Sequence, residues 1–366
     1  MPAQAPTAAA PAPLPAPGQP PVAWPDPARH AAFEAWLAPL AAAQGLRTDS
    51  LRPASADASF RRYLRLDDAA GGSRIVMDAP PPQEDVRPFV AVAEALAAAG
   101  LPAPRVLAAD AARGFLLLDD LGSELALAVL QQAVARGDAA AADRLLREAV
   151  GLLLQWQQRI DASALPAYDE ALLRRELALF PDWCVQREHG VAWTEAQQAL
   201  WQGVCDRLVA SALAQPVLAV HRDYMPRNLM CTPAGLAMLD FQDAVRGPIT
   251  YDLASLIRDA FLSWDEAVEL DVAVRYWEQA RAAGLPVDAD FGEFWRQVEW
   301  MGLQRHLKVL GIFCRLKHRD GKPRYAEDLP RFFGYAHRVA SRYTGLRPLT
   351  LLLEPLMGTS RVNAFY

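Results

Sequence analysis

The sequence predicts an α+β fold of two lobes: a small, strand-rich N-terminal lobe and a larger, mainly helical C-terminal lobe. Strand signals cluster before residue 122, and after Ser123 the apolar residues follow mostly helical spacing. The 366 residues, 52% of them hydrophobic, are enough for each lobe to bury its own core. We place the boundary near Leu121, which gives an N-lobe of residues 28–121 and a C-lobe of residues 122–366.

The first 27 residues are expected to form a disordered tail, because proline and alanine dominate them. They do not resemble a signal peptide, since they lack a basic start and prolines interrupt every apolar run. No apolar run in the chain is long enough to cross a bilayer, so no membrane partner is expected.

The N-lobe elements follow in order. Residues 28–44 carry apolar side chains at helical spacing, and residues 86–99 form a second expected helix that ends at Gly100. Between them, FRRYLRL (60–66) and SRIVMD (73–78) flank a DDAAGG turn and predict a hairpin. A further strand is expected in GFLLLDDLG (114–122).

One segment interrupts the helical pattern of the C-lobe. PVLAVHRDYMPRNLMCTPAGLAMLDFQDA contains two short apolar runs, VLAV and LAMLDF, and TPAG supplies a turn between NLMC and LAML. Strands that bracket a loop would place Asp223, Asn228 and Asp240 at strand ends, where functional side chains are often displayed.

Composition excludes several classes of protein and site. The net charge is −6 and no basic block occurs, so nucleic acid is not an expected partner. The four cysteines stand far apart, which suits neither a zinc site nor a disulfide framework and favours free thiols in the cytoplasm. Common P-loop, dinucleotide-loop, zinc-protease and serine-hydrolase motifs are absent. The sequence carries no signal for an oligomeric state.

The stretch HRDYMPRN (221–228) matches the H-R-D-x-x-x-x-N catalytic-loop pattern of kinases. Asp223 would accept the proton of an attacking hydroxyl, and Asn228 and Asp240 would offer oxygen ligands to a hard cation. The alternative is that Asp223 and Asp240 are ordinary turn carboxylates. His221 is expected to brace the loop without taking part in the chemistry.

HRDYMPRNLM, followed by LDFQDAVRGPITYDLASLIRD, resembles the aminoglycoside phosphotransferase and choline kinase group, small-molecule relatives of protein kinases. The resemblance covers most of the chain after the tail, and it implies a two-lobed protein-kinase-like fold with ATP and Mg²⁺ as cofactors. Within the group, GLQRHLKVLGIF and the pieces above are most similar to kinases of peptidoglycan recycling. The reaction implied by this resemblance transfers the ATP γ-phosphoryl group to the anomeric (C1) hydroxyl of N-acetylmuramate, N-acetylglucosamine or both, in cell-wall recycling.

Further site residues are implied by this resemblance. LLLDDLG (116–122) looks like the segment between lobes where backbone groups bind adenine, so Leu118, Asp119 and Leu121 are expected there. Asp252 in TYDLAS resembles the aspartate that braces the family's catalytic loop.

The sequence departs from kinase patterns in three places. Gln242 stands where D-F-G motifs have glycine, and the nucleotide-loop glycines are replaced by SADASFRRY (55–63). The phosphate-binding lysine of the early strand is also absent, and its place falls near Met77. Only three of the 37 basic residues are lysines, all after residue 307. An arginine is therefore expected to contact phosphate, and the sequence leaves three choices open: Arg61, Arg62 and Arg74. For each of them a solvated surface role is the alternative.

The sugar contacts are less clearly indicated. Trp183 is a candidate for stacking on the sugar ring, although most of the tryptophans are expected in the core. The predicted helix 295–316 places Gln304 on a polar stripe with Gln297, Lys308 and Arg315, for which a solvated face is the simpler interpretation. Arg258 is a candidate for a substrate carboxylate. Other acceptors, such as an aminoglycoside, choline or homoserine, and a non-catalytic ATP-binding pseudokinase remain the alternatives.

Overall fold

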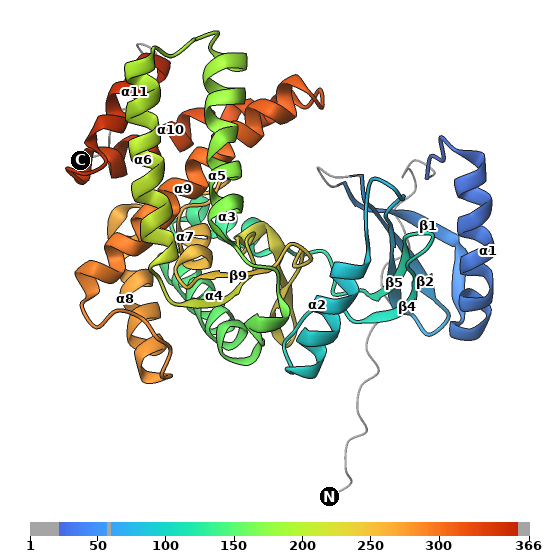
Figure 1. Cartoon of the computed structure of the whole chain (residues 1–366). Coiled ribbons are helices and arrows are strands. Elements are labelled where there is room, and N and C mark those ends of the chain that lie inside the picture. The colour runs from blue at the N-terminus through green and yellow to red at the C-terminus, as the bar shows by residue number, and fades with distance from the viewer. Residues whose placement is uncertain (1–21, 57–59, 358–366) are drawn as a thin grey trace, which may run out of the picture. The chain divides into compact units, whose positions relative to one another are not determined.

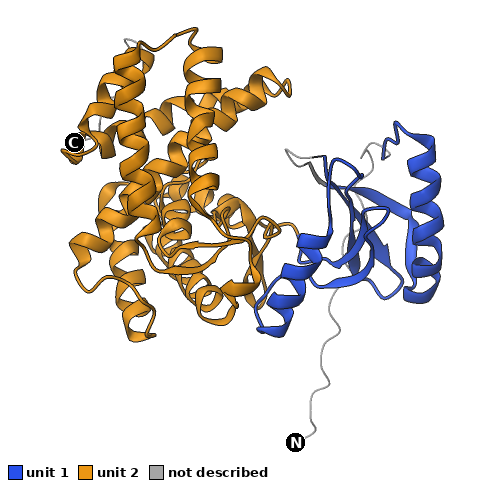
Figure 2. Cartoon of the chain, viewed as in Figure 1, with its two compact units in different colours: residues 1–122 blue, residues 123–366 orange. Residues whose placement is uncertain are grey.

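The computed structural model describes residues 22–56 and 60–357 (Figure 1). The chain divides into two compact units, Met1–Gly122 and Ser123–Tyr366 (Figure 2). This division falls one residue after the boundary drawn from the sequence.

Unit 1 contains a five-stranded antiparallel sheet in the order β1-β2-β3-β5-β4 and two helices. The strands are β1 (Leu46–Ala56), β2 (Arg62–Asp68), β3 (Ser73–Asp78), β4 (Val106–Asp110) and β5 (Phe115–Asp119), and the helices are α1 (Pro27–Gln44) and α2 (Arg87–Ala98). The predicted α+β class is confirmed.

Helix α1 lies against one face of this sheet (Figure 1). Its start is fixed by Asp26, whose side chain accepts from the Ala28 amide, and its end by Gly45 at φ 65°. Its apolar stripe buries Phe33 and Leu37 against sheet residues such as Leu64.

The expected tail is too long by several residues. Trp24 packs against Phe33 with ring centroids 4.7 Å apart, and Val22 joins the same apolar cluster. Residues 22–27 are therefore part of unit 1, because burying the indole stabilises an ordered start. Residues 1–21 of the expected tail lie outside the described residues.

The hairpin of β2 and β3 forms as predicted, but β1 and β4 were missed. β1 is polar, contains Pro53 and pairs with β2 through register shifts, so it lacks the regular alternation of a strand. β4 is only five residues long and two of them are alanine. Part of the expected nucleotide loop (55–63) is strand, since Ser55 pairs with Tyr63, while residues 57–59 lie outside the described residues.

Unit 2 is mainly helical, with two small two-stranded sheets that pair β6 with β9 and β7 with β8. Its strands are β6 (Val217–Val220), β7 (Leu229–Thr232), β8 (Gly235–Met238) and β9 (Val245–Pro248). Its α-helices are α3 (Ala126–Arg136), α4 (Ala139–Arg159), α5 (Glu170–Leu179), α6 (Glu195–Leu213), α7 (Tyr251–Ile257), α8 (Glu266–Ala282), α9 (Phe291–His318), α10 (Leu329–Arg342) and α11 (Thr350–Met357). The other helical segments are η1 (Ala162–Ala164), η2 (Phe180–Glu188), η3 (Pro226–Asn228), η4 (Pro323–Asp328) and η5 (Arg347–Leu349), of which η2 is a π-helix. No helix among the residues described here combines the length and apolar character needed to cross a membrane.

Helix α9 runs through the core of unit 2 and contacts α5, α6, α7, α10 and η2. Its Gly311 lies so close to the end of α5 that a Cβ there would stand 2.4 Å from the Leu179 carbonyl carbon. The interpretation of its polar stripe as a solvated face was wrong for Gln304 and Lys308. Both side chains are buried, because α9 is packed on nearly all sides.

A buried carboxylate anchors two arginines at the end of β3. Asp78 is 1% exposed, accepts from Arg29 Nη2 at 2.7 Å and forms an ion pair with Arg62. Removing one partner of such a buried pair leaves cations without their counter-ion.

We expect Asp78→Ala to lower the free energy of unfolding of unit 1 by about 3 kcal/mol. Urea denaturation followed by tryptophan fluorescence measures this, since Trp24 and Trp36 lie in unit 1. Asp119→Ala is the control: its partner Arg105 is 71% exposed, so the loss should stay below about 1 kcal/mol. Equal losses in the two variants would contradict the expectation.

Candidate active site

Helix α4 anchors the chain on both sides of Asp223. Strand β6 leads into the loop that carries Asp223, and Trp156 Nε1 donates to the Ala219 carbonyl of that strand at 3.0 Å. On the other side of Asp223, the Tyr224 hydroxyl donates to the Ala149 carbonyl at 2.7 Å. Both anchors are fully buried, so Asp223 lies between two fixed points on one helix.

Asp252 in α7 fixes the backbone immediately before Asp223. Its buried carboxylate accepts from the His221 amide at 2.7 Å and from the Arg222 amide at 3.0 Å. Burial raises the pKa of Asp252 to about 7, while the two amide donors oppose that rise by favouring the ionised form. The bracing role that the family resemblance implied agrees with this contact.

The backbone is strained at two positions of the site. Among the described residues, Arg222 (φ 73°) and Asp240 (φ 59°) are the non-glycine residues with positive φ. A left-handed conformation costs roughly 1–2 kcal/mol for a residue with a Cβ. Such outliers persist where surrounding contacts hold them, and they cluster at functional sites.

Asp223 and Asn228 are joined directly. Asn228 Nδ2 donates to the Asp223 carbonyl at 3.0 Å, and the Asn228 amide donates to Met225 at 2.8 Å. The β7–β8 hairpin continues this pairing, since the Leu239 amide donates to the Asn228 carbonyl at 2.9 Å. Asp240 therefore follows the residue that pairs with Asn228, and all three candidate side chains come from one loop and hairpin.

The glutamine that replaces the D-F-G glycine contacts both neighbouring carboxylates. Gln242 Nε2 donates to Asp240 Oδ1 at 2.9 Å and to Asp243 Oδ2 at 3.2 Å. The departure from the kinase pattern thus adds a bridge between the two aspartates.

His221 is placed to brace the loop. It is fully buried, and its ring meets the rings of Trp156 and Tyr224 edge-on at 5.9 and 5.8 Å. Burial lowers its pKa to about 4, so the imidazole is neutral at physiological pH.

The expected sugar contact from Arg258 is contradicted by its surroundings. Arg258 is fully buried and donates to Glu269 and Glu299, each at 2.9 Å. These two carboxylates already balance its charge inside the unit, so no substrate carboxylate is needed.

The other two sugar candidates also face the interior. Gln304 is fully buried between Tyr168 and Glu176 (3.3 Å each), which contradicts its assignment as a sugar contact. Trp183 is partly buried against the core of unit 2, and its stacking role stays a prediction.

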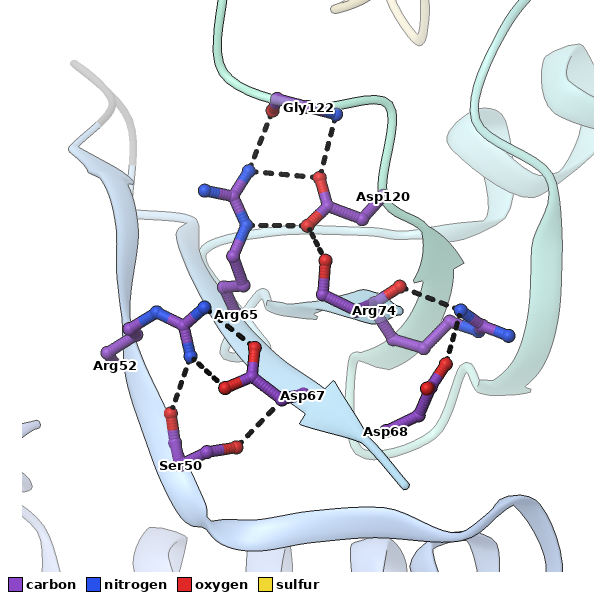
Figure 3. Close-up of polar contacts among 9 residues, drawn as sticks. Ser50, Arg52, Arg65, Asp67, Asp68, Arg74, Asp120 and Gly122 are labelled. Carbon is purple, nitrogen blue, oxygen red and sulfur yellow. Dashed lines mark hydrogen bonds and ion pairs between the residues drawn. The ribbon is translucent and has the colours of Figure 1, made fainter. Parts of the chain in front are cut away.

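The arginines proposed for phosphate are engaged within unit 1. Arg62 pairs with Asp78 and lies 4.3 Å from the Trp24 ring centroid. Arg74 donates to Asp68 at 3.2 Å (Figure 3). Arg61 lies 4.0 Å from Glu84. These partners make each arginine part of an ion pair before any phosphate is present.

Arg65 forms a further ion pair of unit 1, which the sequence did not indicate. Arg65 reaches from β2 to the end of β5, where it binds Asp120 at 2.5 and 2.9 Å and the Gly122 carbonyl at 2.7 Å (Figure 3). Ser73 donates to the same carboxylate at 2.6 Å. Its partner lies 55 residues away in the chain, so spacing alone gave no signal for it.

The segment that is expected to bind adenine has one backbone donor already in use. The Asp119 amide donates to the Arg105 carbonyl at 3.1 Å, and Leu118 pairs with Ile75 and Val106 inside the sheet. Leu121 lies beyond the end of the strand, and its contact with adenine stays a prediction.

Comparison with known proteins bears on this arrangement. Residues 50–287 match the phosphotransferase enzyme family, a span that includes the Asp223 loop and the β7–β8 hairpin. The chain belongs to this family. The predicted resemblance is confirmed.

Members of the family with high similarity are known from pseudomonads. An N-acetylmuramate/N-acetylglucosamine kinase of Pseudomonas putida is 51% identical over 85% of this chain and 90% of its own length. One from Pseudomonas aeruginosa is 52% identical over 84% and 88%. Among solved structures, a choline/ethanolamine kinase family protein from Mesorhizobium loti shares the fold, with a TM-score of 0.58 and 15% identity over 90% of this chain and 99% of that one.

We expect Asp252→Asn to reduce phosphotransferase turnover at least about tenfold, because displacement of a catalytic group lowers the rate steeply. The amide nitrogen of asparagine cannot accept a hydrogen bond, so an amide of His221 or Arg222 loses its partner at about 1–3 kcal/mol. Steady-state kinetics and chemical denaturation measure the two effects.

Asp161→Asn provides the control for this prediction. Asp161 is exposed and accepts from the Ser163 amide at 2.9 Å, a role that asparagine fills equally well. Normal turnover of Asp252→Asn would show that the loop does not need the carboxylate.

Proposed function

We propose that this chain is a cytoplasmic kinase that transfers the γ-phosphoryl group of ATP to the C1 hydroxyl of N-acetylmuramate, N-acetylglucosamine or both, in cell-wall recycling. The observation that carries the proposal is the pair of kinases named for these sugars, about half identical over more than four-fifths of the chain. The four free thiols fit a reducing compartment.

Asp223 is the proposed general base. Its loop is fixed by Asp252, Trp156 and Tyr224, so its carboxylate is held ready to accept the proton of the sugar hydroxyl. Phosphoryl transfer otherwise requires mostly positioning and charge neutralisation, which a rigid loop supports.

Asn228 and Asp240 are the proposed holders of a nucleotide-bound Mg²⁺. The amide nitrogen of Asn228 is used by Asp223, which leaves its oxygen as the donor suited to a hard cation. Asp240 adds a carboxylate from two residues beyond the end of β8. When bound, Mg²⁺ would neutralise phosphate charge, and it commonly takes further ligands from phosphates and water. Within the described part of the chain, no three His, Cys, Asp or Glu residues form a metal site by themselves.

The function is tested by phosphorus NMR of the product formed from ATP and N-acetylmuramate. We expect a new signal coupled to the anomeric proton, and Asp223→Asn should lower its rate of formation by about 10²- to 10⁴-fold while ATP still binds in calorimetry. N-Acetylglucosamine, choline, homoserine and an aminoglycoside serve as parallel acceptors. Transfer only to choline, homoserine or the aminoglycoside, or transfer to none of the acceptors, would overturn the proposal.

Asp240→Asn tests the cation site. Replacing the carboxylate by an amide removes a charged oxygen ligand, so the Mg²⁺ concentration for half-maximal rate should rise at least about tenfold. The measurement is the initial rate of ADP release as Mg²⁺ is titrated at saturating ATP. Asp243→Asn is the matched control, because Asp243 is an exposed carboxylate in the same segment. An equal rise of the half-maximal Mg²⁺ concentration in both variants would contradict the special role of Asp240.

A further inference from the structure

A buried carboxylate behind the catalytic loop collects an unusual number of partners. Glu176 of α5 is 6% exposed, and its Oε1 receives Arg222 Nη2 at 2.5 Å and Lys308 Nζ at 3.1 Å. Its Oε2 receives the Tyr168 hydroxyl and, at 3.3 Å, Gln304 Nε2. We call these five residues the Glu176 cluster.

Lys308 enters the cluster from α9 and is itself almost fully buried. Besides Glu176, its ammonium donates to the Tyr251 hydroxyl at 3.2 Å, in the first turn of the helix that carries Asp252. Arg222 and Lys308 carry two positive charges against one negative charge on Glu176. The charge of Asp223 adds to that of Glu176 in favouring the charged forms, since both carboxylates help to raise the pKa of Arg222 and of Lys308 against the opposing effect of burial.

Arg222 connects this cluster to the candidate base. Its side chain ends on Glu176, its amide is held by Asp252, and its φ of 73° is a strained value for arginine. Asp223 is the next residue, so the orientation of the Arg222 peptide sets the position of the Asp223 Cα and the direction of its side chain. Loss of the ion pair would allow this peptide to relax.

We infer that Glu176 and Lys308 are positioning residues for the proposed transfer reaction: they hold Arg222 in its strained conformation and thereby fix Asp223. The inference rests on the proposed function, because it concerns the placement of the same candidate base. Sequence reasoning gave no such role to either residue.

The same two helical segments provide a matched control. Lys317 of α9 binds Glu188, at the end of η2, at 2.6 and 2.8 Å, and η2 continues directly from α5. The Glu188 pair therefore ties the same segments together by the same chemistry without contacting Arg222. Because the Glu188 pair is more exposed, it controls for the tie between the two segments, and the pH profile and hydrogen exchange below distinguish positioning from a loss of stability.

The kinetic test compares Glu176→Gln and Lys308→Met with Glu188→Gln and Lys317→Met. We expect kcat to fall about 10- to 100-fold in the first two, since a small displacement of a catalytic group has effects of this size. The KM for ATP should stay within about threefold, because the residues proposed to contact ATP lie outside the Glu176 cluster. Lys308→Arg retains a cation and should recover most of kcat. The Glu188 and Lys317 variants should keep kcat.

The pH profile adds a readout that a structural role would not change. Arg222 and Lys308 help to hold the pKa of Glu176 at about 2 despite its burial, so the carboxylate stays ionised throughout the assay range. Tyr168, Tyr251 and Asp223 are the other titratable groups whose charges act on the pair. In Lys308→Met, burial should raise the Glu176 pKa, and kcat should fall as the pH drops towards about 5. Glu176→Gln has no such carboxylate, so its low kcat should lack this acid limb.

Hydrogen exchange separates this inference from the function itself. Glu176→Gln and Lys308→Met should increase deuterium uptake in peptides covering residues 221–228, and Glu188→Gln should not, whatever the acceptor is. If wild-type protein transfers phosphate to neither sugar but uptake changes as expected, the proposed function fails and the positioning role stands. If Glu176→Gln keeps kcat within twofold and uptake is unchanged, the positioning role is overturned.

Discussion

The candidate site depends on one carboxylate that binds two consecutive backbone amides. Asp252 accepts from His221 and Arg222, and this contact fixes the chain at the point where β6 ends and the Asp223 loop begins. The amides have no other role in a regular element, since β6 ends at Val220. A buried acceptor at this point is therefore needed to satisfy both amides. The positions of Asp223 and of the β7–β8 hairpin after it depend on this contact.

The polar interior of unit 2 is organised around ion pairs rather than isolated charges. Arg258 binds two glutamates, and Glu176 binds an arginine and a lysine. Buried charges of this kind are costly unless they are paired and hydrogen-bonded, so their value lies more in fixing geometry than in net stability. In this chain they lie behind the loop and along α9, where geometry matters for transfer.

The sequence was sufficient for the fold class, the N-lobe hairpin and the loop–hairpin that carries Asp223, Asn228 and Asp240. These features follow from local patterns: alternation, turn residues and a motif of fixed spacing. β1 escaped prediction because its regularity is broken by Pro53 and register shifts. Arg258 was a candidate because its charge suits a substrate carboxylate, and Gln304 because it lies on a polar stripe of a predicted helix. Only the packing of α9 and its neighbours shows that both have partners inside. Long-range pairs such as Arg65 with Asp120 leave no trace in spacing at all.

The unequal use of arginine and lysine has a practical consequence for chemical probing. Lys308, Lys317 and Lys322 all lie in unit 2, and Lys308 is enclosed by Glu176 and Tyr251. Amine-directed reagents therefore find no lysine in unit 1. On unit 2 they would modify the more accessible lysines first. A change in the labelling of Lys308 would then report directly on opening of the interior beside the Asp223 loop.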